Sequence, residues 1–184
     1  EATRIRPNTA LKASVENSSV DLPVVVAPNP VHAQFLDLPL LREGDNEVSP
    51  YVAVTATPWP GGAVFFASRG ADEYDVDYYT TEPTVLGRTL TNLMKTIPHR
   101  WSPVSVDVEI MQGTLSSVSE ANLLAGRNLA AIKNDSDTEW ELFQFQHAAL
   151  LPDGSYRLSR LLRGQFGTDA FIPDQHLAGS NIII

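Results

Sequence analysis

Residues 138–169, TEWELFQFQHAALLPDGSYRLSRLLRGQFGTD, decide the fold, because two strand-like segments flank a turn within them. The turn is residues 151–155, LPDGS. Proline presets φ for a turn and glycine accepts a positive φ, so Pro-Asp-Gly between two alternating segments predicts a β-hairpin. The second strand, residues 156–162, then runs into a tight turn at Gly164 and Gly167. Thr168 and Asp169 can close this turn with side-chain hydrogen bonds.

The second strand of this hairpin carries arginines on both faces. Strict alternation puts Arg160 on the face of Tyr156, and Arg157 on the face of Arg163. Because neither face is purely apolar, we expect a strand covered on both sides, with packed arginine stems and guanidinium groups paired to carboxylates or backbone carbonyls. A phosphate loop is disfavoured, since the glycines are few and no helix is expected to follow. The structural motif so defined comprises Trp140, Tyr156, Arg157, Arg160, Arg163, Gly164 and Gly167.

Short apolar segments recur along the rest of the chain at intervals of about a dozen residues, a rhythm typical of all-β domains. The remaining expected strands are residues 22–27, 35–41, 51–57, 63–68, 73–79, 105–111 and 129–133. Residues 116–126, SSVSEANLLAG, are the best helix candidate, with Ser117 or Ser119 as N-cap and Gly126 after the last turn. The sequence predicts a mainly β fold, an antiparallel β-sandwich or distorted barrel with one short helix.

Composition limits the function. The 184 residues have a net charge of −9 and no cysteine, which disfavours direct binding to nucleic acid and excludes disulfides and thiol catalysis. No apolar run is long enough to cross a membrane. Residues 1–21 are interpreted as a linker or the end of a preceding domain, and residues 22–184 as a β-rich domain truncated at its C-terminus. Both ends look like cuts in a longer chain.

The acidic segment 73–79, EYDVDYY, alternates between apolar and charged residues. Tyr74, Val76 and Tyr78 are expected on one face, and the carboxylates on the other. The spacing does not fit a calcium loop, so a charged strand edge that opposes aggregation is the favoured interpretation. A glycan hydrolase using the carboxylates is a remote alternative. Those carboxylates are Glu73, Asp75 and Asp77.

Three aromatic residues are candidates for stacking on a sugar: Trp59, Tyr78 and Tyr79. Trp59 lies in the rigid segment 57–62, TPWPGG, which would hold an indole in a fixed orientation. A plug over the end of a β-fold needs the same rigidity, and this structural role is favoured. The four histidines are too widely spaced for a metal site on one helix face. No cofactor, metal site or catalytic residue is predicted.

Several segments resemble one family when they are read in order. They are residues 35–41, 51–68, 84–90, 113–132 and above all 138–169, whose W-E-x-x-Q-F and Y-R-L-S-x-L-L-R-G-Q-x-G-T patterns are the most specific. This order resembles the C-terminal region of the baseplate hub protein of gene transfer agents and siphophage-like tails, a phage tail or host-specificity protein with an upstream TIM-barrel-like domain. The resemblance covers roughly residues 22–184.

The resemblance implies a structural and interaction module of a phage-like tail tip or baseplate protein, a virion component that takes part in host contact and DNA delivery. It implies other tail or baseplate proteins as partners, a homotrimeric full-length protein, no enzymatic activity in this region, and a location in the particle tail after assembly in the bacterial cytoplasm. The alternative is a carbohydrate-binding module that recognises polysaccharide of the host cell envelope.

Overall fold

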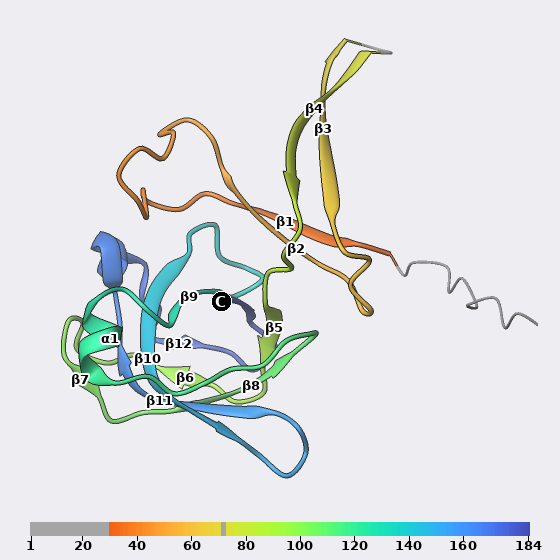
Figure 1. Ribbon diagram of the computed structural model, residues 1–184. Helices are drawn as coiled ribbons and strands as arrows, with labels where there is room; N and C mark the ends of the chain where they lie inside the picture. Colours follow the sequence, from red (N-terminus) through yellow and green to blue (C-terminus); the bar gives the residue numbers. More distant parts are fainter. Residues whose placement is uncertain (1–29, 71–72) are drawn as a thin grey trace, which may run out of the picture.

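The computed structural model describes residues 30–70 and 73–184. The strand expected at 22–27 and the linker expected at 1–21 lie outside the described residues. The described chain forms a barrel, a two-stranded ribbon beside the barrel, and a hairpin that projects from the end of the ribbon (Figure 1).

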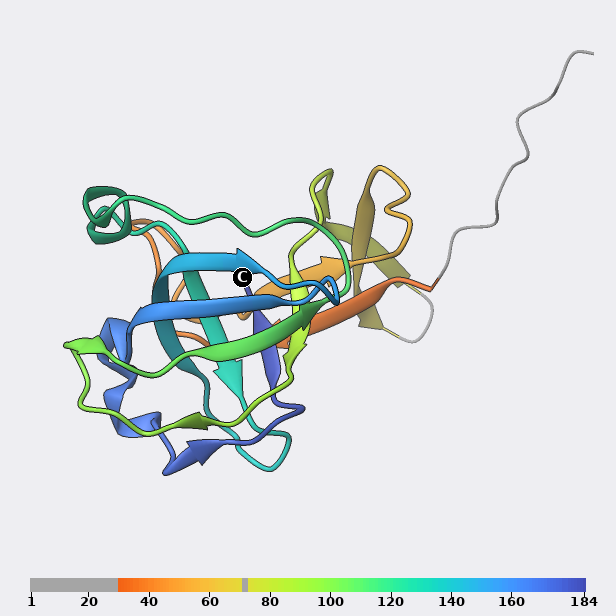
Figure 2. The same ribbon diagram turned by 90° about the horizontal axis from the view of Figure 1, so that it is seen from below.

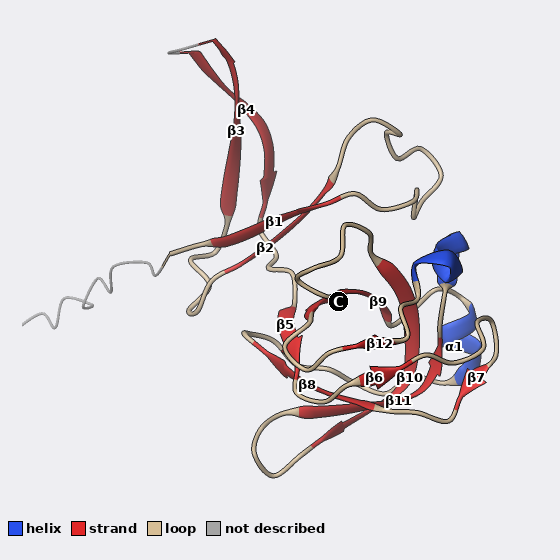
Figure 3. Ribbon diagram, turned by 180° about the vertical axis from the view of Figure 1, so that it is seen from behind, coloured by secondary structure: helices blue, strands red, loops and turns tan. Residues whose placement is uncertain are grey.

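Strands dominate the described part of the chain (Figure 3). The ribbon and the projecting hairpin contain β1 (His32–Leu36), β2 (Tyr51–Thr55), β3 (Ala63–Gly70) and β4 (Glu73–Thr80). The remaining strands are β5 (Leu86–Thr89), β6 (Leu93–Met94), β7 (Trp101–Ser102), β8 (Val106–Ile110), β9 (Leu129–Lys133), β10 (Glu141–Leu150), β11 (Tyr156–Leu162), β12 (Gln175–His176) and β13 (Asn181–Ile183). The helical elements are α1 (Glu120–Leu124) and the 3₁₀ helix η1 (Gln165–Phe171).

Six strands close into an antiparallel barrel. They pair in the order β10, β9, β13, β5, β8 and β11, and β11 pairs back with β10, while β7 adds to the end of β11. The mainly β prediction is confirmed, and of its two forms the structure has the barrel. Closure pairs every barrel strand on both sides, so the barrel presents no open edge. Its interior is filled by a fully apolar cluster: Leu93, Val106, Val108, Ala130, Ile132, Phe143, Phe145, Tyr156, Leu158, Leu161 and Ile182.

The predicted hairpin is present as β10 and β11, with Leu150 opposite Tyr156 at the turn. The carboxylate of Asp153 accepts hydrogen bonds from both the backbone N–H and the hydroxyl of Ser155. The Leu151 N–H donates to the Ser155 carbonyl over 2.8 Å. Gly154 has a φ of 87°, so the positive φ that the sequence predicts for this turn is confirmed.

The face assignment within β11 is wrong. Tyr156 and Leu158 point into the core as expected, but Arg160 has a φ of 56°, and the next buried residues are Leu161 and Arg163. The positive φ interrupts the regular alternation of the strand. Before Arg160 the even-numbered residues point into the core, and after it the odd-numbered residues do.

The expected helix is confirmed as α1, a single short turn. The Ser119 hydroxyl accepts a hydrogen bond from the Asn122 N–H, which makes Ser119 the N-cap. Leu123 is fully buried and anchors the helix. The strand expected at 35–41 is mostly wrong, because β1 ends at Leu36. Instead of pairing, Leu38 packs beside Trp140 in a second apolar cluster.

The turn after β11 has the glycines it needs. Gly164 and Gly167 have φ values of 67° and 79°, and a Cβ on Gly164 would come within 2.8 Å of the Asp169 Cβ. The turn continues into the 3₁₀ helix η1, which the sequence did not predict. Gly167 lies within the bounds of η1, but its backbone angles are not helical. Thr168 closes the turn as predicted, because its hydroxyl donates to the Gln165 carbonyl over 2.8 Å.

Thr168 also connects this turn to the barrel, and we expect Thr168→Val to reduce the free energy of unfolding by about 1–3 kcal/mol. Its hydroxyl oxygen accepts the Leu142 N–H over 2.9 Å in a fully buried position, so valine leaves a buried donor unpaired. Urea denaturation measures the loss. Thr55→Val is the matched control, since Thr55 is fully buried and its hydroxyl has no partner among the described residues. Equal losses in the two variants would contradict this role.

Candidate interaction surface

The β3–β4 hairpin projects from the rest of the molecule (Figure 1), and seen from below it lies beside the ribbon, at the opposite end of the molecule from α1 (Figure 2). Within the described ranges its two strands pair only with each other. Residues 73–79 of β4 are all exposed, so β4 is not the half-buried strand that its alternation predicts. A two-stranded hairpin with solvent around it is at best marginally stable in water, and contacts outside the hairpin are expected to stabilise it.

A β-bulge in this hairpin changes which side chains share a face. Phe65 lies opposite Tyr78, but the next residue, Phe66, lies opposite Val76, so Asp77 is the extra residue. Directly paired residues point to the same face, and neighbours along a strand point to opposite faces. Tyr78 therefore lies on the other face from Val76, and the predicted common face of Tyr74, Val76 and Tyr78 is wrong.

The bulge gathers five large side chains on one face, which we call the aromatic strip: Val64, Phe66, Tyr74, Val76 and Tyr79. Their exposed fractions range from 52% to 69%. The opposite face of β3, with Phe65, is half-buried. Large contiguous apolar surfaces on a soluble domain usually mark a site of protein contact. Val64 and Phe66 were not predicted to belong to an interaction surface. Residues 63–66, AVFF, are apolar at consecutive positions, and this pattern could have indicated that both faces of the strand carry apolar side chains.

The β4 strand, which contributes to the aromatic strip, also carries three exposed carboxylates. Asp75 lies opposite Ala67, on the face away from the strip, and Asp77 occupies the bulge. Glu73 is at the tip of the hairpin, opposite Gly70. All three residues are exposed on a projecting strand, which fits the charged strand edge that the sequence favours.

The three candidate sugar-stacking residues do not form one platform. Tyr78 and Tyr79 are neighbours in β4 and point to opposite faces. Trp59 is half-buried, and its indole N–H donates to the Thr81 carbonyl over 2.8 Å. The Phe65 and Tyr78 rings are tilted by 37° with centroids 6.1 Å apart. No observation on these rings favours glycan binding.

Arg157 and Arg160 are exposed, so the expectation that β11 is covered on both sides is wrong, but both guanidinium groups pair with carboxylates as the sequence predicts. Arg157 donates through Nε and Nη2 to the two oxygens of Asp107, both over 2.7 Å. Arg160 donates to Glu120 of α1 over 2.7 Å and lies 4.2 Å from the ring centre of Trp101. These contacts attach β11 to β8, to the short helix and to β7.

Arg163 forms a fully buried ionic cluster. Its Nε and Nη2 both donate to the carboxylate of Glu141, the second over 2.5 Å, and its Nη1 donates to the Met94 carbonyl over 3.0 Å. His176 contacts the same carboxylate through Nε2 at 2.7 Å. All three side chains are at most 1% exposed. Arg163 therefore joins the end of β11 to β10 and β6, and His176 joins β12 to the same carboxylate, so Arg163 is a structural residue with no surface left for a ligand.

The ionic cluster changes the titration of Glu141. Burial favours the neutral carboxyl, but the hydrogen bonds from Arg163 and His176 outweigh burial and lower the Glu141 pKa below its usual value of 4.5. The Nδ1 atom of His176 is buried with no partner among the described residues. The carboxylate is thus held ionised in the core, and its function is to neutralise Arg163.

Trp140, the remaining aromatic member of the motif, is buried beside Leu142 and Ala131 in the second apolar cluster. The ammonium of Lys133 lies 5.1 Å from its ring centre. The structure thus places every member of the predicted motif in the barrel or in its turns, where each has a packing or pairing role.

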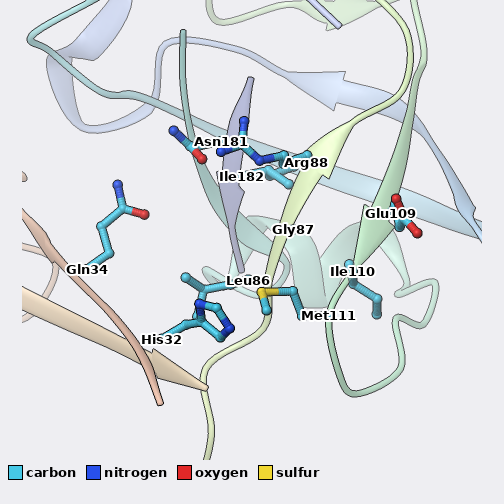
Figure 4. Close-up of a pocket in the computed structure, with 10 residues that line it drawn as sticks. All are labelled: His32, Gln34, Leu86, Gly87, Arg88, Glu109, Ile110, Met111, Asn181 and Ile182. Carbon is cyan, nitrogen blue, oxygen red and sulfur yellow. The ribbon is translucent and has the colours of Figure 1, made fainter. Parts of the chain in front are cut away.

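A pocket of about 540 Å³ lies between the ribbon and the outside of the barrel (Figure 4). Its lining comes from β1, β5, β8 and β13, and includes His32, Arg88 and Glu109. Arg88 donates to the Gly179 carbonyl over 2.7 Å, so its charge is partly engaged. None of the described residues that line the pocket is a phenylalanine, tyrosine or tryptophan, the side chains on which sugars usually stack.

In residues 30–70 and 73–184, no group of three or more histidine, cysteine, aspartate or glutamate side chains is arranged to hold a metal ion. No helix in that same part of the chain is long and apolar enough to cross a membrane.

The fold defines the chain as a small closed antiparallel β-barrel protein with a projecting β-hairpin. The family model described as Rcc01698-like, C-terminal matches residues 84–183, and the chain belongs to this family. A search among curated proteins finds no match. The matched residues contain every strand of the barrel, whereas the ribbon and the projecting hairpin precede them.

Proposed function

We propose that the chain is a structural and interaction module of a phage-like tail tip or baseplate protein, and that the aromatic strip docks it on a neighbouring tail protein. The observation that carries this proposal is the strip itself, five large side chains that are each more than half exposed on one face of a projecting hairpin. The resemblance of residues 22–184 to baseplate hub proteins supplies the context.

The structure suggests the chemistry of the partner. Buried aromatic side chains provide most of the binding energy in many protein interfaces, and polar residues surround them. Glu73 at the tip of the hairpin and Asp77 in the bulge lie beside the strip, Asp75 lies on the opposite face, and the chain has a net charge of −9. A complementary surface is an apolar groove bordered by lysine or arginine side chains. A second copy of this acidic chain fits this description less well.

We expect the double substitution F66D/Y79D in the full-length protein to prevent its incorporation into tail-like particles. Each lost anchor weakens docking by about 2 kcal/mol, a factor of roughly 30. The measurement is mass spectrometry of particles purified from the bacterium that encodes the chain. Circular dichroism checks that the variant is folded.

Val48→Asp is the matched control, because Val48 is 89% exposed and lies in the loop between β1 and β2, away from the strip. It is expected to enter particles at the wild-type level. The proposal is wrong if wild-type protein is absent from particles, or if F66D/Y79D enters them as efficiently as the control.

A further inference from the structure

The outer edge of β3 is an open strand edge. Within residues 30–70 and 73–184, β3 pairs with β4 on one side and with no strand on the other. This edge lies on the side of the hairpin that faces away from the loop between β1 and β2 (Figures 1 and 3). Since Asp77, the extra residue of the bulge, belongs to β4, residues 63–68 of β3 keep a regular pleat. Their outward backbone N–H and C=O groups can therefore bind a further strand.

The two edges of the hairpin differ in charge. The β4 strand carries Glu73, Asp75 and Asp77, whereas residues 63–68 of β3, AVFFAS, carry no charge. Charged side chains protect a strand edge from pairing, so the β4 edge opposes a further strand and the β3 edge accepts one.

A second copy of the chain is the occupant that this edge fits. A strand edge that pairs in the antiparallel direction is complementary to itself, so two copies can use the same residues. The barrel lies beyond the base of the hairpin (Figure 1), so parallel pairing would bring both barrels to the same end of the shared sheet, whereas antiparallel pairing places them at opposite ends. The two β4 strands are then three strand spacings apart, about 14 Å, so salt screens the repulsion between their carboxylates.

We infer that the β3 edges of two copies pair antiparallel about a twofold axis, which forms a four-stranded sheet in the order β4, β3, β3, β4. Four strands can be stable where a two-stranded hairpin is marginal. The axis is perpendicular to the sheet, so both aromatic strips lie on the same face and form one larger surface. The acidic β4 edges end the sheet, so assembly stops at two copies. This inference goes beyond the proposed docking of the strip on a tail protein and does not depend on it.

The mass of the chain in solution tests the inference. In analytical ultracentrifugation, the wild-type mass is expected to rise from that of one chain to that of two as the concentration increases. Ala67→Lys is expected to keep the mass of one chain, because lysine on an edge strand opposes pairing. Ala67 lies opposite Asp75, on the face away from the strip, so this change leaves the strip intact. The control Val48→Lys, in the exposed loop between β1 and β2, is expected to dimerise like the wild type.

Cysteine cross-linking locates the contact, since the wild-type chain has no cysteine. A residue beside a twofold axis lies next to its own copy in the second chain, and a disulfide requires Cα atoms about 4.4–6.8 Å apart. Four variants each carry a single cysteine, at position 64, 65, 66 or 67, and at least one of them is expected to form a covalent dimer on oxidation. Val76→Cys, on β4 and about 14 Å from its copy, is expected not to cross-link.

Three results would overturn the inference. The first is a chain that stays monomeric at every concentration, and the second is a dimer that Ala67→Lys leaves intact. The third is the absence of a cross-link in all four β3 variants; if Val76→Cys then cross-links instead, the two copies meet through their strips. Each result is independent of whether the strip binds a tail protein, which incorporation into particles measures.

Discussion

Replacement of Arg163 by methionine is expected to lower the free energy of unfolding by about 3–5 kcal/mol. Methionine keeps much of the volume but leaves Glu141 ionised in the core with only His176 as a partner, and it removes a hydrogen bond to the Met94 carbonyl. An uncompensated buried charge is among the costliest single changes in a small domain. Urea denaturation at neutral pH measures the loss.

Arg157→Met is the matched control, because Arg157 lies on the same strand and also binds a carboxylate bidentately. Its side chain is 52% exposed, whereas that of Arg163 is fully buried. Exposed ion pairs contribute about 0–1 kcal/mol, so the control is expected to lose little. A similar loss in both variants would show that the burial of Arg163 is not what makes it important.

The pH dependence provides a further test of the same cluster. Since the pKa of Glu141 is lower in the folded protein than its usual value of 4.5, its stabilising contribution is fully present above that value. It is lost as the pH falls through the folded-state pKa. Burial raises the pKa of Glu141, and Arg163 contributes most of the interactions that lower it. Protonation of Glu141 removes the charge that Arg163 neutralises. The difference in unfolding free energy between wild type and Arg163→Met is therefore expected to become smaller as the pH falls. A difference that widens at low pH would contradict this account.

Gly87→Ala is expected to destabilise the barrel by about 3 kcal/mol. Gly87 lies in β5 between β13 and β8, opposite Ile182 on one side and Ile110 on the other. A Cβ at this position would be 2.1 Å from the Glu109 carbonyl oxygen, which is backbone and cannot move without breaking the β5–β8 pairing. Thermal or urea denaturation measures the effect.

Gly70→Ala is the control for the glycine change. Gly70 ends β3, and a Cβ there would meet no described atom within 4 Å. Its expected effect is within about 0.5 kcal/mol. If Gly87→Ala were equally mild, β5 and β8 would have to be further apart than the structure places them.

Local chemistry made much of this fold predictable. The Pro-Asp-Gly turn, the Ser119 cap and the glycine turn at Gly164 were readable because each depends on residues within a few positions of one another. The sequence also predicted that the arginines pair with carboxylates or backbone carbonyls. The sequence did not predict which carboxylates these are, because Asp107 is 50 residues away from Arg157 and Glu120 is 40 residues away from Arg160.

The candidate interaction surface was less predictable. The acidic and aromatic residues of β4 were noticed in the sequence, but strict alternation gave the wrong faces for them. The bulge at Asp77 depends on how β4 pairs with β3, and one extra residue reverses the alternation beyond it. The strip exists only because of this register.

By itself the sequence determined the mainly β class, the longer strands such as β10 and β11, the turn between them, the short helix and the requirement that the arginines be paired, because these follow from propensity, turn chemistry and charge within short segments. It did not identify the short strands β5, β6, β7, β12 and β13. Only the tertiary structure decided that the sheet closes into a barrel, that Arg160 reverses the inward side of β11, and that Arg163 and His176 both contact Glu141 in the core. The reason is that strand register and closure depend on pairing between distant residues, and a shift of one residue exchanges the two faces of a strand.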